Sequence, residues 1–167
     1  MSNYKSLEEI KKFWPKEAPN IKNVFKYVSK YKDDLIVIKY GGNVLIDRNV
    51  FNNFIDDIFI LNLLGLSIVV VHGGGPRIEK ELEKEKIQTK FLNGLRITDE
   101  KVIKIVEDVL IDFNNDIVRS LNKKGCKAVS INSKINNIID VVPDIQELGF
   151  VGLPNKININ IIKDIID

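Results

Sequence analysis

Two stretches decide the fold: Leu35-Ile36-Val37-Ile38-Lys39-Tyr40-Gly41-Gly42-Asn43 and Ser67-Ile68-Val69-Val70-Val71-His72-Gly73-Gly74-Gly75-Pro76. In each, a short apolar run predicts a buried strand, glycines end it, and a helical pattern follows. A strand that turns through glycine into a helix presents free backbone N–H groups and the positive end of a helix dipole. The two turns therefore predict a site for phosphate or carboxylate groups.

The remaining elements follow from periodicity, caps and glycines. Apolar spacing predicts helices over 6–14, 21–31, 48–64, 76–85, 99–124 and 158–166, strands at 35–39, 67–71 and 127–132, short extended pieces within 86–97, and hairpin strands within 137–152. Asn20, Asp47 and Thr98 are the expected N-caps. We therefore expect an α/β fold, a mostly parallel sheet sandwiched by helices. Its apolar strands should be covered on both faces.

Composition narrows the function classes. The 167 residues include 44% hydrophobic ones, enough for a core, and carry a net charge of only +2. That balance argues against nucleic-acid or membrane-surface binding driven by charge. One cysteine and one histidine cannot form a typical zinc site or a disulfide framework, and we expect no protein metal site. Without a signal sequence or membrane-spanning run, we expect a cytoplasmic protein.

Three features are candidates for the chemistry. Lys39 lies at the end of the first strand, where its ammonium group can neutralise a transferring phosphoryl group; alone, it would be read as a solvent-facing lysine. Gly73, Gly74 and Gly75 allow a ligand to approach the backbone, whereas a merely tight turn would need one glycine. Arg96 precedes a helix and is suited to clamp a carboxylate. Because both turns follow parallel strands, they should share one sheet edge and line one site.

Four strings then point to a family. Ile38-Lys39-Tyr40-Gly41-Gly42-Asn43, Val70-Val71-His72-Gly73-Gly74-Gly75-Pro76, Gly94-Leu95-Arg96-Ile97-Thr98-Asp99 and Leu148-Gly149-Phe150-Val151-Gly152 occur in this order. Together they closely resemble the N-acetylglutamate kinases of the amino acid kinase family, whose fold is carbamate kinase-like. Single strings are shared with aspartate, carbamate and uridylate kinases. The third string combined with the fourth is more specific.

The resemblance implies ATP-dependent phosphorylation of the side-chain carboxylate of N-acetyl-L-glutamate, a step of arginine biosynthesis. It implies that Lys39 stabilises the transferring phosphoryl group and that Gly41 and Gly42 bind the phosphates of ATP, which magnesium accompanies. It also implies that Gly73, Gly74 and Gly75 hold the acyl substrate and that Arg96 pairs with its other carboxylate.

The resemblance also sets the expected organisation. Residues 20–167 correspond to the N-terminal, acyl-substrate lobe, and residues 1–19 form a helical extension. The C-terminal nucleotide lobe of the family is expected to be absent from this chain, so activity of the chain alone stays open. In arginine-inhibited relatives such an extension joins dimers into a hexamer, so a homo-oligomer and L-arginine inhibition are expected; the alternative is a helix that docks on its own subunit. Two other functions stay open: a non-catalytic module that binds an acyl amino acid or arginine, and another amino acid kinase.

The loop Ser130-Ile131-Asn132-Ser133-Lys134-Ile135-Asn136 departs from the family, which usually has a Ser-Gly-Lys-Asp-Gly turn there. The loss of both glycines removes the residues that allow unusual backbone angles. We therefore expect this loop to differ in conformation from its counterparts.

Overall fold

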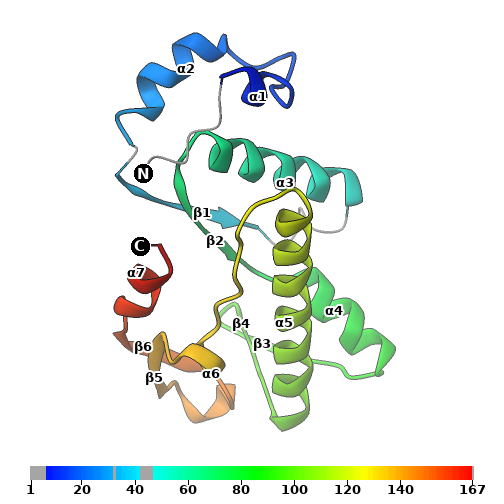
Figure 1. Cartoon of the computed structure of the whole chain (residues 1–167). Helices are drawn as coiled ribbons and strands as arrows, with labels where there is room; N and C mark the ends of the chain where they lie inside the picture. The colour runs from blue at the N-terminus through cyan, green and yellow to red at the C-terminus, as the bar shows by residue number, and fades with distance from the viewer. Residues whose placement is uncertain (1–6, 32, 42–46, 167) are drawn as a thin grey trace. The chain divides into compact units, whose positions relative to one another are not determined.

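A computed structural model describes residues 7–31, 33–41 and 47–166 (Figure 1). Residues 1–73 with 117–128 form one compact unit, and residues 74–116 with 129–167 form a second. Ser6, the expected first residue of the N-terminal helix, and Gly42 lie outside the described residues.

The first unit is built on a parallel strand pair. β1 (Leu35–Tyr40) pairs with β2 (Ser67–His72), and the register runs from Leu35 opposite Ser67 to Tyr40 opposite His72. Between them lies α3 (Arg48–Leu63), whose N-cap is Asp47, as predicted: its carboxylate accepts from the amides of Asn49 and Val50. This strand–helix–strand arrangement confirms the predicted α/β class.

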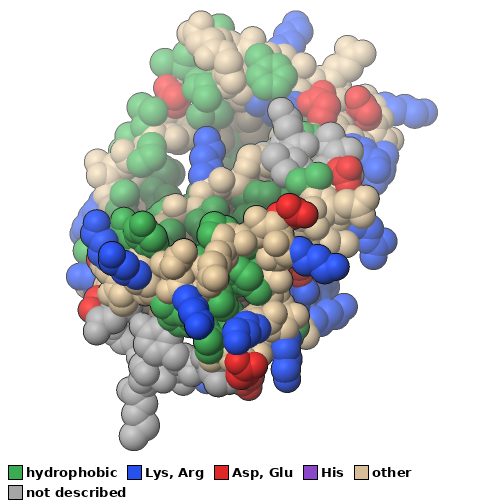
Figure 2. All heavy atoms as spheres, turned by 90° about the horizontal axis from the view of Figure 1, so that it is seen from above, with side chains coloured by type: hydrophobic (Ala, Val, Ile, Leu, Met, Phe, Trp, Pro, Cys, Tyr) green, Lys and Arg blue, Asp and Glu red, His purple; other side chains and the backbone are tan. Residues whose placement is uncertain are grey.

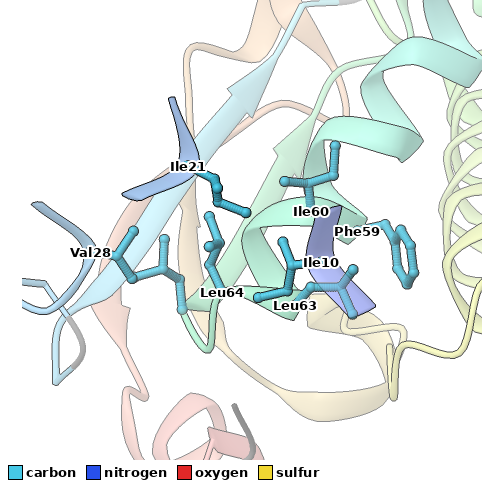
Figure 3. Close-up of a cluster of buried hydrophobic side chains, with 8 residues drawn as sticks. Ile10, Ile21, Val28, Phe59, Ile60, Leu63 and Leu64 are labelled. Atoms are coloured by element: carbon cyan, nitrogen blue, oxygen red, sulfur yellow. The ribbon is translucent and has the colours of Figure 1, made fainter. Parts of the chain in front are cut away.

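The core of the first unit lies between α3 and the two N-terminal helices, α1 (Leu7–Lys11) and α2 (Ile21–Val28). Its buried side chains surround Ile10, which is fully buried against the end of α3 (Figure 3); they are Ile10, Ile21, Val28, Phe59, Ile60, Leu63, Leu64 and Leu66. Asn20 caps α2 as predicted, by accepting from the amide of Lys22. The N-terminal helix is therefore shorter than expected and docks on its own chain.

The two faces of the strand pair differ in exposure. Side chains on β1 are alternately exposed, and Val37 and Val71 remain 62% and 50% exposed. In a strand alternate side chains point to opposite faces, so the face of Val37 and Val71 is the more exposed one among the described residues. An apolar sheet surface of this kind is what a further layer of structure would bury.

The second unit begins with α4 (Gly75–Lys84) and the short antiparallel hairpin of β3 (Phe91–Leu92) and β4 (Leu95–Arg96). The hairpin turn confirms the predicted extended pieces: Asn93 and Gly94 both have positive φ, 52° and 82°, the combination that favours a two-residue hairpin loop. The long α5 (Glu100–Lys123) follows; its residues up to Asp116 belong to this unit and those from Ile117 to the first. Gly125, with φ of 95°, ends it as predicted.

The expected cap of α5 is wrong by one residue. The carboxylate of Asp99, not Thr98, accepts from the amides of Lys101 and Val102, each at 2.9 Å. Thr98 is instead buried, and its backbone pairs with the segment around Gly149: its amide donates to the carbonyl of Leu148, and its carbonyl accepts from Phe150. The threonine hydroxyl donates to the carbonyl of Arg96.

The third predicted strand, at 127–132, is also wrong, because the described chain has no strand there. The side chain of Asn122, at the end of α5, accepts from the amide of Ala128 and donates to its carbonyl, at 2.8 and 3.0 Å. The amide group of Asn114 similarly donates to the carbonyl of Ile131. Side chains of one helix thus occupy the backbone groups that a neighbouring strand would have used.

A short helix that the sequence did not reveal, α6 (Ser133–Asn136), begins at Asn132 in the loop that departs from the family pattern. It is followed by the antiparallel pair of β5 (Ile139–Pro143) and β6 (Gly152–Ile157), by a 3-10 helix between them (Gln146–Leu148), and by α7 (Asn160–Ile166). The hairpin and the last helix were predicted, although the second strand lies beyond the expected range. In the described residues only one of the three strand pairs is parallel.

Candidate functional site

Both glycine turns start at the same edge of the parallel pair. The last residues of β1 and β2, Tyr40 and His72, lie opposite each other, so Gly41 and Gly73 follow at equivalent positions. The backbone amide of Gly73 donates to the carbonyl oxygen of Tyr40 at 3.3 Å, which extends the ladder by one bond. The expectation that the turns share one sheet edge is therefore confirmed.

The glycines of the second turn are not equivalent. The amide of Gly73 is already bonded to Tyr40, whereas Gly74 and Gly75 lead into α4, where the first N–H groups of a helix have no intrahelical partner. A Cβ built on Gly74 would lie 2.7 Å from Cδ2 of Leu110, but one built on Gly75 would meet nothing within 4 Å. Gly74 thus lies against the tip of the Leu110 side chain of α5, whereas the space beside Gly75 is open.

At Gly41, the last residue described before the first turn, a Cβ would meet no described atom within 4 Å. Lys39 is exposed, on the face of β1 opposite to that of Tyr40. His72 lies with Nδ1 at 3.2 Å from the carbonyl oxygen of Gly73, within hydrogen-bond distance. That contact fits a histidine that orients the turn.

Tyr40 is a residue near the site that the sequence did not single out. It is only 6% exposed, and its ring stacks on Phe54 of α3, with centroids 3.7 Å apart. Its buried hydroxyl has no hydrogen-bond partner among the described residues. Burial raises the pKa of this hydroxyl above its ordinary value, because the charged phenolate is disfavoured away from water. The stacked pair joins the end of β1 to the helix that follows the first turn.

Arg96 belongs to the second unit and is held on three sides. One terminal nitrogen donates to Oγ1 of Thr89, the other donates to the carboxylate of Glu79 at 2.7 Å, and the guanidinium lies 4.7 Å from the ring centroid of Phe91. Its side chain is only 15% exposed. A guanidinium fixed against an aromatic ring is well suited to bind a planar carboxylate, and one carboxylate already lies on it.

The partners of Arg96 were not identified from the sequence. Phe91 pairs with Arg96 in the hairpin, and the amide of Ile97 donates to the carbonyl of Lys90 in the same turn of chain. The Asn93-Gly94 signal could have located Phe91, since a two-residue hairpin fixes the register. Glu79 lies on α4, 17 residues away, and no local pattern connects it with Arg96.

A pocket in the first unit does not include any of the site residues predicted from the sequence. Its volume is about 520 Å³, and its lining is Phe13, Pro15, Asn53, Asp56, Asp57, Phe59, Ile60 and Lys124. No cluster of three metal-binding side chains occurs in the described part of the chain.

Among the helices that the structure describes, none combines the length and the apolar composition of a membrane-spanning segment. The face drawn in Figure 2 carries basic, acidic and apolar side chains together.

Comparison with known proteins identifies relatives that match most of the chain. An acetylglutamate kinase of Pelagibacter ubique is 49% identical over 159 residues, which are 95% of this chain and 55% of the relative. A protein of known structure, smu.665 from Streptococcus mutans, is similar with a TM-score of 0.70 at 29% identity, over 81% of this chain and 55% of that one. This chain spans about half the length of the curated relatives that it matches.

A second solved structure supports the fold alone. The N-acetylglutamate synthase of Neisseria gonorrhoeae, solved with coenzyme A and N-acetyl-glutamate, has a TM-score of 0.70 at 18% identity, over 89% of this chain and 36% of that one. The model of the amino acid kinase family matches residues 34–167, which include both glycine turns and Arg96. On that match, over most of its length, the chain belongs to the amino acid kinase family.

Proposed function

We propose that this chain provides the acyl-substrate lobe of an enzyme that transfers the γ-phosphoryl group of ATP to the side-chain carboxylate of N-acetyl-L-glutamate. The observation that carries the proposal is the shared sheet edge, where Gly41 and Gly73 follow Tyr40 and His72. The names of the relatives, acetylglutamate kinases, support the choice of substrate. Residues 20–167 would form this lobe, and residues 1–19 its extension.

The reaction requires little proton transfer. An oxygen of the ionised side-chain carboxylate bonds to the γ-phosphorus while the bond from that phosphorus to the bridging oxygen breaks, which releases ADP. Catalysis of such a transfer consists mainly of positioning and charge neutralisation. A lysine, backbone amides and a helix N-terminus are the groups that these tasks need.

Each predicted residue has a role in the proposal. Lys39 neutralises charge on the phosphoryl group, and the amides of Gly41 and Gly42 bind the phosphates of ATP, whose Mg²⁺ enters with the nucleotide. Gly74 and Gly75 bind the substrate through the N-terminus of α4, and Gly73 shapes the turn through its bond to Tyr40. Arg96 binds the second carboxylate of N-acetyl-L-glutamate.

A second candidate function is a non-catalytic module that binds an acyl amino acid or arginine. It is favoured by the construction of the Arg96 group: Arg96, Glu79, Thr89 and Phe91 all belong to the second unit, so carboxylate recognition there does not depend on the phosphate turn. Another amino acid kinase, specific for a different carboxylate or carbamate, is the third candidate.

The proposal also covers the location, the oligomeric state and the regulation of the enzyme. We infer a cytoplasmic homo-oligomer that L-arginine inhibits, as in arginine-sensitive relatives. Phe13 follows α1 and is 50% exposed, with its edge against Phe59, so part of its ring remains available to another subunit. Light scattering on the chain with and without residues 1–19 tests this point; an unchanged mass would contradict it.

Calorimetric titration tests the function directly. N-acetyl-L-glutamate and MgATP are titrated separately into the 167-residue chain, and ADP release is followed with both present. Turnover with N-acetyl-L-glutamate, lost in Lys39→Met, supports the kinase. Binding of N-acetyl-L-glutamate without MgATP binding or turnover supports a truncated kinase lobe or the non-catalytic module. Absence of N-acetyl-L-glutamate binding contradicts both.

A further inference from the structure

The guanidinium of Arg96 already binds a carboxylate of this chain. The carboxylate of Glu79, on α4, accepts from Nη2 of Arg96 at 2.7 Å, while Nη1 donates to Thr89 and the ring of Phe91 lies beside the guanidinium. Of these three partners, only Glu79 is negatively charged, and its carboxylate occupies Arg96 as a bound substrate carboxylate would.

Burial distinguishes the two members of this ion pair. The side chain of Arg96 is 15% exposed, whereas that of Glu79 is 50% exposed. The arginine is therefore fixed by its surroundings, and the glutamate reaches it from the solvent side. Because the Glu79 carboxylate is half exposed, it can return to water at modest cost, so another carboxylate can displace it from Arg96.

We propose that Glu79 is an internal competitor for the carboxylate site on Arg96 and thereby sets the affinity of this site for an anionic substrate. The inference rests on the proposed binding of a substrate carboxylate by Arg96. Binding requires that the substrate take the place of Glu79 on the guanidinium, and the displaced Glu79 then repels the incoming anion. Both effects weaken binding of a doubly charged substrate.

The competing explanation is that Glu79 positions Arg96. The two explanations predict opposite orders of affinity when the side chain is shortened. If Glu79 competes, the dissociation constant for the substrate should fall from the native chain to Glu79→Gln and again to Glu79→Ala. If it positions Arg96, the alanine variant should bind most weakly.

Calorimetric titration of N-acetyl-L-glutamate into the full chain tests the proposal. We expect binding to tighten about 2- to 5-fold in Glu79→Gln, the size of one exposed ion pair, with a larger gain at low salt. Glu81→Gln is the matched control, because Glu81 lies on the same helix and pairs with Lys84 instead. It should leave the dissociation constant unchanged.

The double variant Glu79→Gln with Arg96→Gln should show no gain over Arg96→Gln alone, since the competition acts through Arg96. Unchanged or weaker binding in both Glu79 variants would overturn the inference while leaving the proposed function intact. Equal binding by Arg96→Gln and the native chain would contradict the proposed role of Arg96, and the inference with it. Absence of binding by the native chain would do the same.

Discussion

The amide of Gly73 donates to the carbonyl oxygen of Tyr40 at 3.3 Å, one step beyond the last paired residues of the parallel strands. This bond fixes where the second glycine turn leaves the sheet relative to the first. Parallel strands deliver their carboxyl ends to one edge, which is where ligands bind in sheets of this kind. The proposed phosphate and acyl-substrate turns follow from this register.

Gly149 should tolerate substitution far less than Gly94. Both have positive φ, 69° and 82°, but a Cβ at 149 would lie 2.3 Å from the carbonyl oxygen of Thr98, whereas one at 94 meets nothing within 4 Å. We expect Gly94→Ala to cost about 1 kcal/mol from backbone strain alone. Gly149→Ala should cost at least about 2 kcal/mol more, because the Thr98 pairing must open.

Urea unfolding followed by circular dichroism measures both variants, which lie in the same unit. Equal losses of stability would contradict the close approach of residues 98 and 149.

Removal of the Tyr40 hydroxyl should not destabilise the protein. Because this buried hydroxyl has no hydrogen-bond partner in the described part of the chain, Tyr40→Phe keeps the stack on Phe54 and removes an uncompensated polar group. We expect a gain of about 1 kcal/mol in unfolding free energy. Tyr27→Phe, at a side chain that is 66% exposed, should change little. A clear loss in Tyr40→Phe would mean that the hydroxyl is bonded in the folded protein.

The same tyrosine should contribute to alkaline unfolding. Burial raises the pKa of Tyr40 in the folded state, so the unfolded chain ionises at a lower pH than the folded one. The free energy of unfolding is therefore unaffected by ionisation below the ordinary pKa of 10.0, and it falls as the pH rises through the folded pKa. We expect Tyr40→Phe to lose less stability than the native chain between pH 9 and about pH 11. Parallel pH profiles of the two proteins would contradict the burial of this hydroxyl.

Replacing Asp56 and Asp57, neighbours in α3, by asparagine should have different effects on stability. Burial and the adjacent Asp56 raise the pKa of Asp57, so its ionised form destabilises the fold, and stability is lost as the pH rises through the folded pKa. Asp57→Asn should therefore raise the urea midpoint at pH 7, and the gain should vanish near about pH 3. Asp56 forms an ion pair with Lys124, so Asp56→Asn should give no such gain. A gain that persists at acidic pH would rule out this account.

The side chain of Asn122 should contribute to the free energy of unfolding, although it lies on the surface of α5. Its side chain bonds both the amide and the carbonyl of Ala128. Asn122→Ala should cost about 1–2 kcal/mol, and Asn122→Asp, which keeps the acceptor, about half as much. Chemical unfolding measures the difference. If alanine had no effect, these two bonds would not be what holds the segment after α5.

Local signals in the sequence predicted most of the first unit. Asp47 before an apolar repeat predicted α3, and the apolar runs at 35–39 and 67–71 predicted β1 and β2, because caps and strand runs act over a few residues. The same holds for the Asn93-Gly94 turn. Membership of the amino acid kinase family followed from motif strings that include these turns.

Long-range contacts were not predictable in the same way. The apolar run at 127–132 has strand character, but Asn122 and Asn114 occupy its backbone groups. Thr98 is a good cap by type, yet its pairing with the segment around Gly149 moves the cap to Asp99. Glu79 reaches Arg96 across 17 residues. In each case, a tertiary hydrogen bond decided between two locally acceptable structures.

Glycine-selective ¹⁵N labelling offers the most direct test, because the chain has only 10 glycines. Upon titration with N-acetyl-L-glutamate, the amide resonances of Gly74 and Gly75 should shift with one dissociation constant, while Gly125, at the end of α5, stays unchanged. Addition of MgATP should then move Gly41. Shifts confined to Gly125 and other distant glycines, or none at saturating ligand, would contradict a ligand site at the shared edge of β1 and β2.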